Sequence, residues 1–284
     1  MTKIIDGKTI SAQIKEKVKL KVQSLLDDGM RAPCLAVVLV GDDEASKVYV
    51  GHKEKACAQT GLESKVFKLS AQTSESDLLD LIQDLNADNK VDGILVQLPL
   101  PDHLDSDRVI QSISPSKDVD GLTYVNQGKL AVGERGLYPC TPSGCIDLLK
   151  TVTPNLSGLH AVVIGRSILV GSPVAKMLTH ENATVTVVHS RTQNPETICK
   201  TADVLVVAAG KRGLVDRSWV KPGAIIIDVG IHRHEGKLCG DVSFEDCKDV
   251  ASAITPVPGG VGPMTIGTLI SNCLEAYLVN NNLV

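Results

Sequence analysis

Apolar and polar residues alternate along the first half of the chain in a way that predicts both strands and helices. Short runs of aliphatic and β-branched residues predict strands at 35–40, 64–69 and 93–98. The segments around them have helical periodicity and predict helices at 8–27, 44–59, 74–87 and 105–113. Ser74 is a suitable N-cap for the third helix, with Asp77 in its first turn. This alternation is typical of a parallel sheet built from βαβ units, so we predict an α/β fold.

The second half repeats the rhythm. After a helix at 143–150, apolar runs predict strands at 160–164, 184–188, 204–208 and 224–228. The arrangement is typical of a Rossmann-like domain with a parallel sheet. The last segment, 264–280, carries apolar residues at helical spacing, and we expect this helix to pack back on the first domain.

The stretch between the halves marks a domain junction. Residues 114–143 contain seven glycine and proline residues, which we interpret as too many for a regular element. We therefore predict two domains with a cleft between them. Residues 1–120 would form an N-terminal α/β domain, joined by the terminal helix at 265–284, and residues 140–264 would form the Rossmann-like domain.

Composition narrows the class of protein. A length of 284 residues allows two domains, and a net charge of −4 without a basic stripe argues against a nucleic acid partner. No apolar run approaches the roughly 20 residues that span a bilayer, and the N-terminus has no features of a secretory signal. We expect no membrane partner and a cytoplasmic protein. The eight cysteines are scattered without metal-ligand spacing, so we expect reduced thiols and no metal.

The turn after residue 164 is a candidate cofactor site. Gly165 and Gly171 lie where a predicted strand runs into a helix. Backbone N–H groups at such a turn can bind a pyrophosphate, assisted by the helix dipole. The spacing is not G-x-G-x-x-G, and glycines are also needed at such turns for purely steric reasons, so both explanations stay open.

The end of the next strand indicates which dinucleotide binds. Ser190 and Arg191 stand where an NAD enzyme places an acid on the ribose 2′-hydroxyl. A hydroxyl and a guanidinium suit a 2′-phosphate instead, and Arg166 and Ser167 of the glycine loop are further candidate ligands. The predicted cofactor is NADP. The alternative is that Arg191 is a solvated surface charge.

A second candidate site lies in the first half. Tyr49 and Lys53 are four residues apart, so on a helix they share one face and could bind and protonate a substrate together. Short-chain dehydrogenases carry the same spacing in their catalytic pair, but there it follows the glycine loop, whereas here it precedes that loop. An ordinary amphipathic helix would show the same spacing.

Six segments together resemble the bifunctional methylenetetrahydrofolate dehydrogenase/cyclohydrolase family, in that family's order. They are YVGHKEKA (49–56), GILVQLPLP (93–101), KDVDG (117–121), PCTP (139–142), GRSILVG (165–171) and TPVPGGVGPMT (255–265). The resemblance covers nearly the whole chain. VQLPLP and PVPGGVGPMT are its most specific parts.

The resemblance implies roles for individual residues. Lys53 would be the central acid/base residue, Tyr49 would pack against the pterin, and Gln97 would hydrogen-bond Lys53. Asp118 would accept hydrogen bonds from the amino edge of the pterin. Each polar residue also has a plainer explanation: a strand-end contact for Gln97 and a turn for Asp118 and Asp120.

The loop in the last motif would complete the folate site. The resemblance implies that the backbone of Pro258, Gly259 and Gly260 helps to wall the cleft, although such a loop could be rigid without holding a ligand. The chain departs from the usual family pattern at Ile168 and Ser172, where polar and basic residues are common. Phosphate contacts at those positions are therefore left open.

The resemblance implies a homodimeric enzyme of one-carbon metabolism. It would oxidise 5,10-methylenetetrahydrofolate with NADP and hydrolyse the methenyl product to 10-formyltetrahydrofolate. Three alternatives stay open: an NADP-linked dehydrogenase of another small molecule, a cyclohydrolase with little dehydrogenase activity, and a dinucleotide-sensing protein without turnover.

Overall fold

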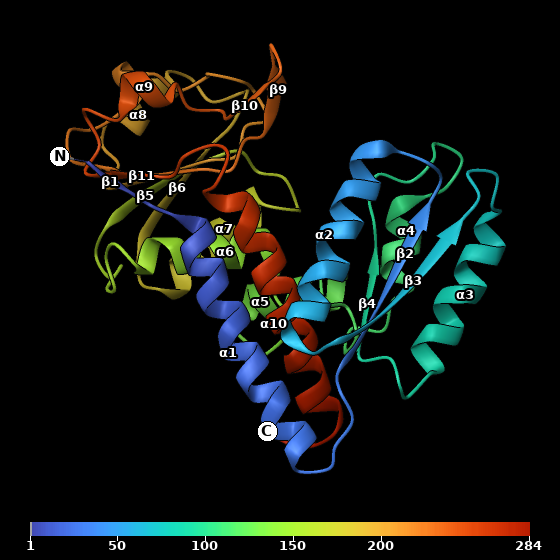
Figure 1. The fold of residues 1–284 in the computed structure, drawn as a ribbon. Coiled ribbons are helices and arrows are strands. Elements are labelled where there is room, and N and C mark those ends of the chain that lie inside the picture. The colour runs from blue at the N-terminus through green and yellow to red at the C-terminus, as the bar shows by residue number, and fades with distance from the viewer. Residues whose placement is uncertain (1) are drawn as a thin grey trace. The chain divides into compact units, whose positions relative to one another are not determined.

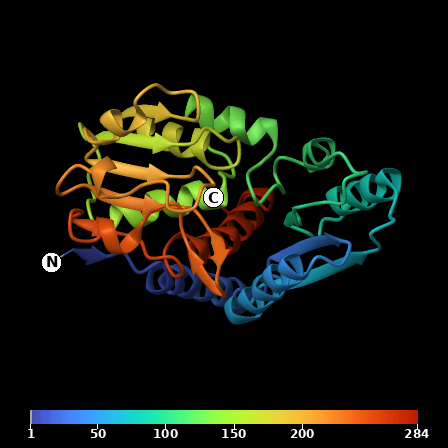
Figure 2. The same cartoon turned by 90° about the horizontal axis from the view of Figure 1, so that it is seen from above.

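A computed structural model describes residues 2–284, which divide into two compact units. The three-stranded unit comprises residues 12–140 and 266–284. The six-stranded unit comprises residues 2–11 and 141–265. Each unit is an α/β structure around a parallel sheet (Figures 1 and 2), so the predicted fold class is confirmed. No helix within residues 2–284 is both long and apolar enough to cross a membrane.

The sheet of the three-stranded unit has the order β3-β2-β4 and all its pairs are parallel. The strands are β2 (Cys34–Val40), β3 (Glu63–Leu69) and β4 (Gly93–Val96). Every residue of β2 is buried, because helices cover both faces of a central parallel strand. That is why its sequence is a continuous apolar run.

Alternate residues of β2 point to two separate cores. Leu35, Val37 and Leu39 pack with helices α1 (Gly7–Asp27), α2 (Glu44–Thr60) and α10 (Val261–Asn280). Ala36, Val38 and Val40 pack with α3 (Glu75–Ala87) and α4 (Ser106–Gln111). The Ser74 hydroxyl accepts a hydrogen bond from Asp77 N at 3.1 Å, which confirms the predicted N-cap of α3.

The sheet of the six-stranded unit has the order β1-β11-β8-β7-β5-β6 and is entirely parallel. Its strands are β1 (Lys3–Ile4), β5 (His160–Ile164), β6 (Thr184–Val188), β7 (Val204–Val207), β8 (Ile225–Asp228) and β11 (Ala253–Ile254). In Figure 2 these arrows lie side by side, and the loops that leave their carboxyl ends share one edge of the sheet.

Helices and a hairpin complete this unit. They are α6 (Cys140–Lys150), α7 (Gly171–His180), α8 (Pro195–Cys199), a 3₁₀ turn (Arg217–Trp219), α9 (Phe244–Cys247) and the antiparallel pair β9 (His232–His234) and β10 (Lys237–Cys239). Trp219 and Phe244 pack against the buried core under α8 and α9. Helix α7, which follows the glycine loop, packs on β5 and β6.

The structure corrects two predictions about the domains, one at the junction and one at the N-terminus. Residues 114–143 do contain regular elements, since α5 (Tyr124–Val132) lies there and α6 begins at Cys140. The glycines do not all break structure: Gly133 ends α5 in the left-handed conformation and Gly128 lies within it. The predicted boundary at residue 1 also differs, because β1 pairs with β11 and so belongs to the six-stranded unit.

Candidate active site and cofactor site

The structure brings Lys53 and Gln97 together in the three-stranded unit. Lys53 projects from α2 and is only 8% exposed, and its Nζ donates to Gln97 Oε1 at 2.8 Å. Gln97 follows β4 directly, and its backbone N–H donates to Val38 O and so extends the strand pairing. Its side-chain Nε2 donates to Leu98 O, which turns the amide oxygen toward the amine.

Two opposing effects act on the Lys53 amine. Burial lowers the pKa of Lys53, because desolvation disfavours the charged form, while the nearby Asp120 carboxylate raises it. Burial in turn raises the pKa of Asp120, and Lys53 lowers it. The Cys140 thiol lies beside the same pair, and burial followed by the Asp120 charge raises its pKa well above the usual range. Lys53, Asp120 and Cys140 therefore form one electrostatically coupled cluster.

Asp118 borders this cluster, since its charge raises the pKa of Asp120 and of Cys140, but it is not among the groups that act on Lys53. Its side chain is 1% exposed. Its Oδ1 accepts from Leu122 N at 3.1 Å, and its Oδ2 accepts from Thr123 N at 2.8 Å and Asn126 Nδ2 at 2.9 Å. The carboxylate is thus engaged by donors of its own chain and organises the turn into α5. This geometry fits the turn role.

Asp120 is the functional candidate that sequence reasoning undervalued. The KDVDG segment offers two aspartates two residues apart, and nothing in the spacing separates them. Lys117 of the same segment is structural as well, since its Nζ donates to the carbonyl groups of Leu85, Asn86 and Asp88 at the end of α3. Only Asp120 of the three charged residues interacts electrostatically with Lys53.

Tyr49 and the proline–glycine loop lie in different units. Tyr49 is one turn before Lys53 on α2 and its side chain is 45% exposed. Pro258, Gly259 and Gly260 belong to the six-stranded unit, where a cis peptide precedes Pro258. A Cβ atom at Gly260 would lie 2.7 Å from Pro256 O, so the loop is tightly folded on itself.

The glycine loop is shaped by close backbone contacts. A Cβ atom on Gly165, whose φ is +115°, would lie 2.2 Å from Ala208 O, and one on Gly171 would lie 2.3 Å from Gly165 O. The chain itself therefore requires both glycines, which supports the steric explanation without excluding a ligand. The Ser167 hydroxyl accepts from Val170 N and Gly171 N, so this side chain braces the loop.

The predicted phosphate ligands stand at the neighbouring strand end. Ile164 of β5 pairs with Val188 of β6, so the glycine loop and residues 189–191 leave adjacent strands at the same edge. Ser190 and Arg191 are both exposed, and Arg166 in the glycine loop is exposed as well. Ser172, one of the departures from the family pattern, donates its hydroxyl to Arg166 O at 3.1 Å and so supports the loop from within.

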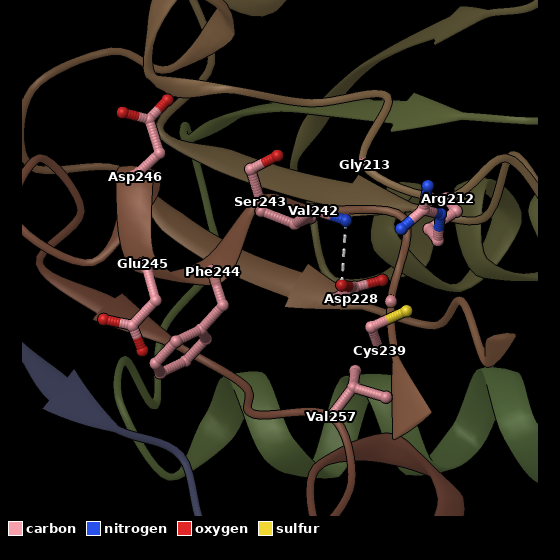
Figure 3. A pocket seen from close by; sticks show the side chains of 11 residues that line it. Arg212, Gly213, Asp228, Cys239, Val242, Ser243, Phe244, Glu245, Asp246 and Val257 are labelled. Carbon is pink, nitrogen blue, oxygen red and sulfur yellow. Dashed lines mark hydrogen bonds between the residues drawn. The ribbon is translucent and has the colours of Figure 1, made fainter. Parts of the chain in front are cut away.

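A separate pocket of about 360 Å³ lies in the six-stranded unit (Figure 3). Its lining includes Arg212, Asp228, Cys239, Phe244 and Val257, and it contains none of the predicted site residues. All eight cysteines are free thiols. Residues 2–284 contain no group of three or more His, Cys, Asp or Glu side chains that could hold a metal ion.

A parallel sheet with a glycine loop, joined to a unit with a buried, hydrogen-bonded lysine, defines a dinucleotide-dependent α/β enzyme. Comparison with known proteins identifies which one. The family model "Tetrahydrofolate dehydrogenase/cyclohydrolase, catalytic domain" matches residues 5–120, and "Tetrahydrofolate dehydrogenase/cyclohydrolase, NAD(P)-binding domain" matches residues 139–281. The chain belongs to the tetrahydrofolate dehydrogenase/cyclohydrolase family, as its motifs predicted.

Individual relatives agree over almost the full length. "Bifunctional protein FolD" of Agathobacter rectalis is 52% identical over 277 residues, which cover 97% of this chain and 99% of that protein. The crystal structure of the bifunctional enzyme FolD from Campylobacter jejuni has a TM-score of 0.96 at 47% identity and covers 100% of both chains. The Trypanosoma brucei enzyme, complexed with NADP cofactor and inhibitor, has a TM-score of 0.93 at 37% identity, covering 99% of this chain and 98% of that one.

Proposed function

We propose that this protein oxidises 5,10-methylenetetrahydrofolate with NADP⁺ and then hydrolyses the 5,10-methenyl product to 10-formyltetrahydrofolate. The observation that carries the proposal is the buried Lys53 amine, which Gln97 orients beside Asp120 in a chain of this family. A lysine in a low-dielectric setting with a lowered pKa is suited to acid/base chemistry near neutral pH.

Hydrolysis needs a group that first accepts a proton and later returns it. Water attacks the electron-poor methenyl carbon, and neutral Lys53 takes the proton that the water loses. The resulting ammonium then gives that proton to the folate nitrogen that leaves when the carbon–nitrogen bond breaks. Gln97 Oε1 holds Nζ at 2.8 Å through one N–H, which leaves the rest of the amine free to turn toward the substrate.

Oxidation needs positioning more than acid/base chemistry. NADP⁺, when bound, accepts a hydride from the methylene carbon. Gly165, Gly171 and the intervening loop would hold its pyrophosphate, and Ser190 and Arg191, with Arg166, would hold its 2′-phosphate. Ser167 would contribute by bracing the loop through the hydrogen bonds that its hydroxyl accepts from Val170 N and Gly171 N.

For the folate itself we assign the acceptor role to Asp120 in place of Asp118. The Asp120 carboxylate is close enough to Lys53 to raise its pKa, whereas both oxygens of Asp118 already accept hydrogen bonds from the turn. Tyr49 supplies an exposed aromatic face one turn from Lys53, on which a pterin ring would stack. Pro258, Gly259 and Gly260 would contribute backbone to the folate wall.

We also propose that the enzyme works in the cytoplasm as a homodimer. Eight free thiols suit a reducing compartment. Strand β6 is an edge strand that pairs only with β5 in the described chain, and Val187 on it is 38% exposed. An exposed apolar edge is a template for pairing with a second copy.

Replacing Lys53 with methionine tests the proposal. Methionine fills a similar volume but cannot carry a proton, so hydrolysis of 5,10-methenyltetrahydrofolate should fall by at least about 100-fold, a typical loss for a general base. NADP⁺ binding should survive, because Lys53 lies in the three-stranded unit. Both are measured on purified protein, by absorbance and by calorimetry.

Lys55→Met is the matched control, because Lys55 is exposed on the same helix. It should hydrolyse the methenyl compound at the wild-type rate. Wild-type hydrolysis by Lys53→Met would contradict the assignment. A wild-type protein that hydrolyses the methenyl compound but forms no NADPH from 5,10-methylenetetrahydrofolate would be a cyclohydrolase alone.

A further inference from the structure

Two buried aspartates join the loops at the carboxyl edge of the six-stranded sheet. Asp228 ends β8 and is 3% exposed, while Asp241 lies between β10 and α9 and is 0% exposed. Asp228 Oδ1 accepts from the backbone N–H groups of Gly230 and Asp241, each at 3.0 Å. Its Oδ2 accepts from Val242 N at 3.0 Å, the bond drawn in Figure 3. Asp228 thus fixes the backbone that carries Asp241.

The Asp241 carboxylate reaches two further segments. Its Oδ2 accepts from the backbone N–H groups of Ala209 at 2.7 Å and Gly210 at 2.8 Å, both in the loop that follows β7. Its Oδ1 lies 2.7 Å from Nε2 of His232, the first residue of β9. One side chain therefore connects the loop after β7, the start of the hairpin and the turn into α9.

The loop after β7 is in direct contact with the glycine loop. The carbonyl oxygen of Ala208 lies where a Cβ atom on Gly165 would come within 2.2 Å of it. A shift of residues 208–210 toward Gly165 would collide with backbone, and a shift away would remove the support for the loop. The geometry of the predicted pyrophosphate cradle consequently depends on where Ala209 and Gly210 are held.

Close contacts with two glycine residues confine the carboxylates of Asp228 and Asp241. A Cβ atom on Gly230 would lie 2.4 Å from Asp241 Oδ1, and one on Gly240 would lie 1.9 Å from Asp228 Oδ2. Glycine at these two positions makes room for the carboxylates. Burying a charged group costs free energy unless hydrogen bonds compensate for the lost water. Each carboxylate therefore needs its N–H donors to stay in place, and in this way it fixes the backbone that carries them.

We propose that Asp241 is a positioning residue for cofactor binding, which holds residues 208–210 against the glycine loop and thereby sets the affinity for NADP⁺. The inference rests on the proposed placement of the dinucleotide at this sheet edge. Asp241 acts through the backbone of Ala209 and Gly210, not by touching the reacting atoms.

The test compares Asp241→Ala with Asp241→Asn by titrating each full-length protein with NADP⁺ in a calorimeter. Alanine leaves two backbone N–H groups without their acceptor, and the dissociation constant should rise at least about 10-fold. Asparagine keeps one oxygen that can accept from Ala209 N and Gly210 N, so it should restore the affinity to within about 3-fold of wild type. A role in stability alone would lower the melting temperature without this difference in binding.

Two further variants keep the test decisive. Asp203→Ala removes a carboxylate that also accepts a backbone N–H, from His160 at 2.9 Å, but at the opposite edge of the sheet, and it should leave NADP⁺ affinity unchanged. Ala209→Pro removes one donor while leaving Asp241 intact, and it should weaken NADP⁺ in the same direction as Asp241→Ala, which decides the matter should the alanine variant not fold.

Wild-type affinity in Asp241→Ala, an equal loss in Asp203→Ala, or a loss in Asp241→Asn as large as that in Asp241→Ala would each overturn the proposal. Failure of the wild-type protein to bind NADP⁺ would overturn the proposed function together with this inference.

Discussion

At the scale of single residues, the pKa of Lys53 decides when the site can act. Burial lowers this pKa and the Asp120 charge raises it. A general base works only in its neutral form, so hydrolysis should be slow below the pKa of Lys53 and should rise to a plateau above it. Desolvation is the larger of the two effects, which places this rise below the usual range for a lysine.

Asp120→Asn should move the rise to lower pH. The Asp120 carboxylate is the main group that offsets the effect of burial, so its removal lowers the pKa of Lys53 further. The neutral amine then persists in more acidic solution. The measurement is the pH profile of hydrolysis at saturating 5,10-methenyltetrahydrofolate, which separates this shift from weaker binding. A profile that keeps its position would mean that another group is the base.

Cofactor choice is also decided by single residues. Arg191→Ala should lower kcat/KM for NADP⁺ at least about 10-fold and for NAD⁺ by less than about 2-fold, because a charge-assisted hydrogen bond to the 2′-phosphate is lost. Arg217→Ala, which removes an exposed arginine elsewhere in the same unit, should change neither value. Equal losses for both dinucleotides in Arg191→Ala would show that Arg191 is only a surface charge.

At the scale of elements, the same substitution should have opposite effects at two glycines. A Cβ atom on Gly171 would meet Gly165 O, Gly165 C and Arg166 N within 2.8 Å, all of them backbone atoms. Gly171→Ala should therefore cost about 1 to 3 kcal/mol of unfolding free energy and open the glycine loop. Gly128 lies in α5, and a Cβ atom there would have nothing within 4 Å, so Gly128→Ala should stabilise the protein by up to about 1 kcal/mol.

Denaturant unfolding measures both values, and NADP⁺ titration shows whether the loop has changed. Only Gly171→Ala should weaken the binding of NADP⁺. If both variants lose stability equally, the space around each glycine is not what decides the effect.

The elements themselves were predictable to the extent that burial determines residue type. Strands such as β2 and β7 are covered on both faces, so their residues are continuously apolar and easily recognised. The short strands β1 and β11 have two residues each, too few for any periodicity. The β9–β10 hairpin is mostly polar, so it lacks the apolar pattern that predicts a strand. Its turn lies at Glu235 and Gly236, which both have positive φ, and Gly236 is the local residue that favours such a turn.

The site was less predictable than the sheets. The contact between Lys53 and Gln97 joins residues far apart in sequence, and it followed from the family's motifs rather than from spacing. Choosing between Asp118 and Asp120 needed the hydrogen bonds of the folded turn. Asp241 gave no signal at all, because most of its partners are backbone groups.

At the scale of the whole molecule, the free edge of β6 should decide the assembly. Thr184 N donates to Leu159 O and Val188 O accepts from Gly165 N, so these residues face β5 and Val187 N faces outward. Val187→Pro removes that outward donor, which edge strands tolerate, and should convert the proposed dimer to a monomer. Sedimentation velocity measures the state. Val187→Thr keeps the N–H and should remain dimeric, and a dimeric proline variant would place the interface elsewhere.

Helices α1 and α10 each contribute residues to both units, and this has a consequence for the order in which the protein is made. Strand β1 leaves the ribosome well before its partner β11, at Ala253–Ile254. The core beneath β2 likewise lacks Leu269, Ile270 and Cys273 until α10 emerges. The lysine site is therefore encoded early and completed late, so an interrupted translation should yield a chain that can neither close its sheet nor hydrolyse its substrate.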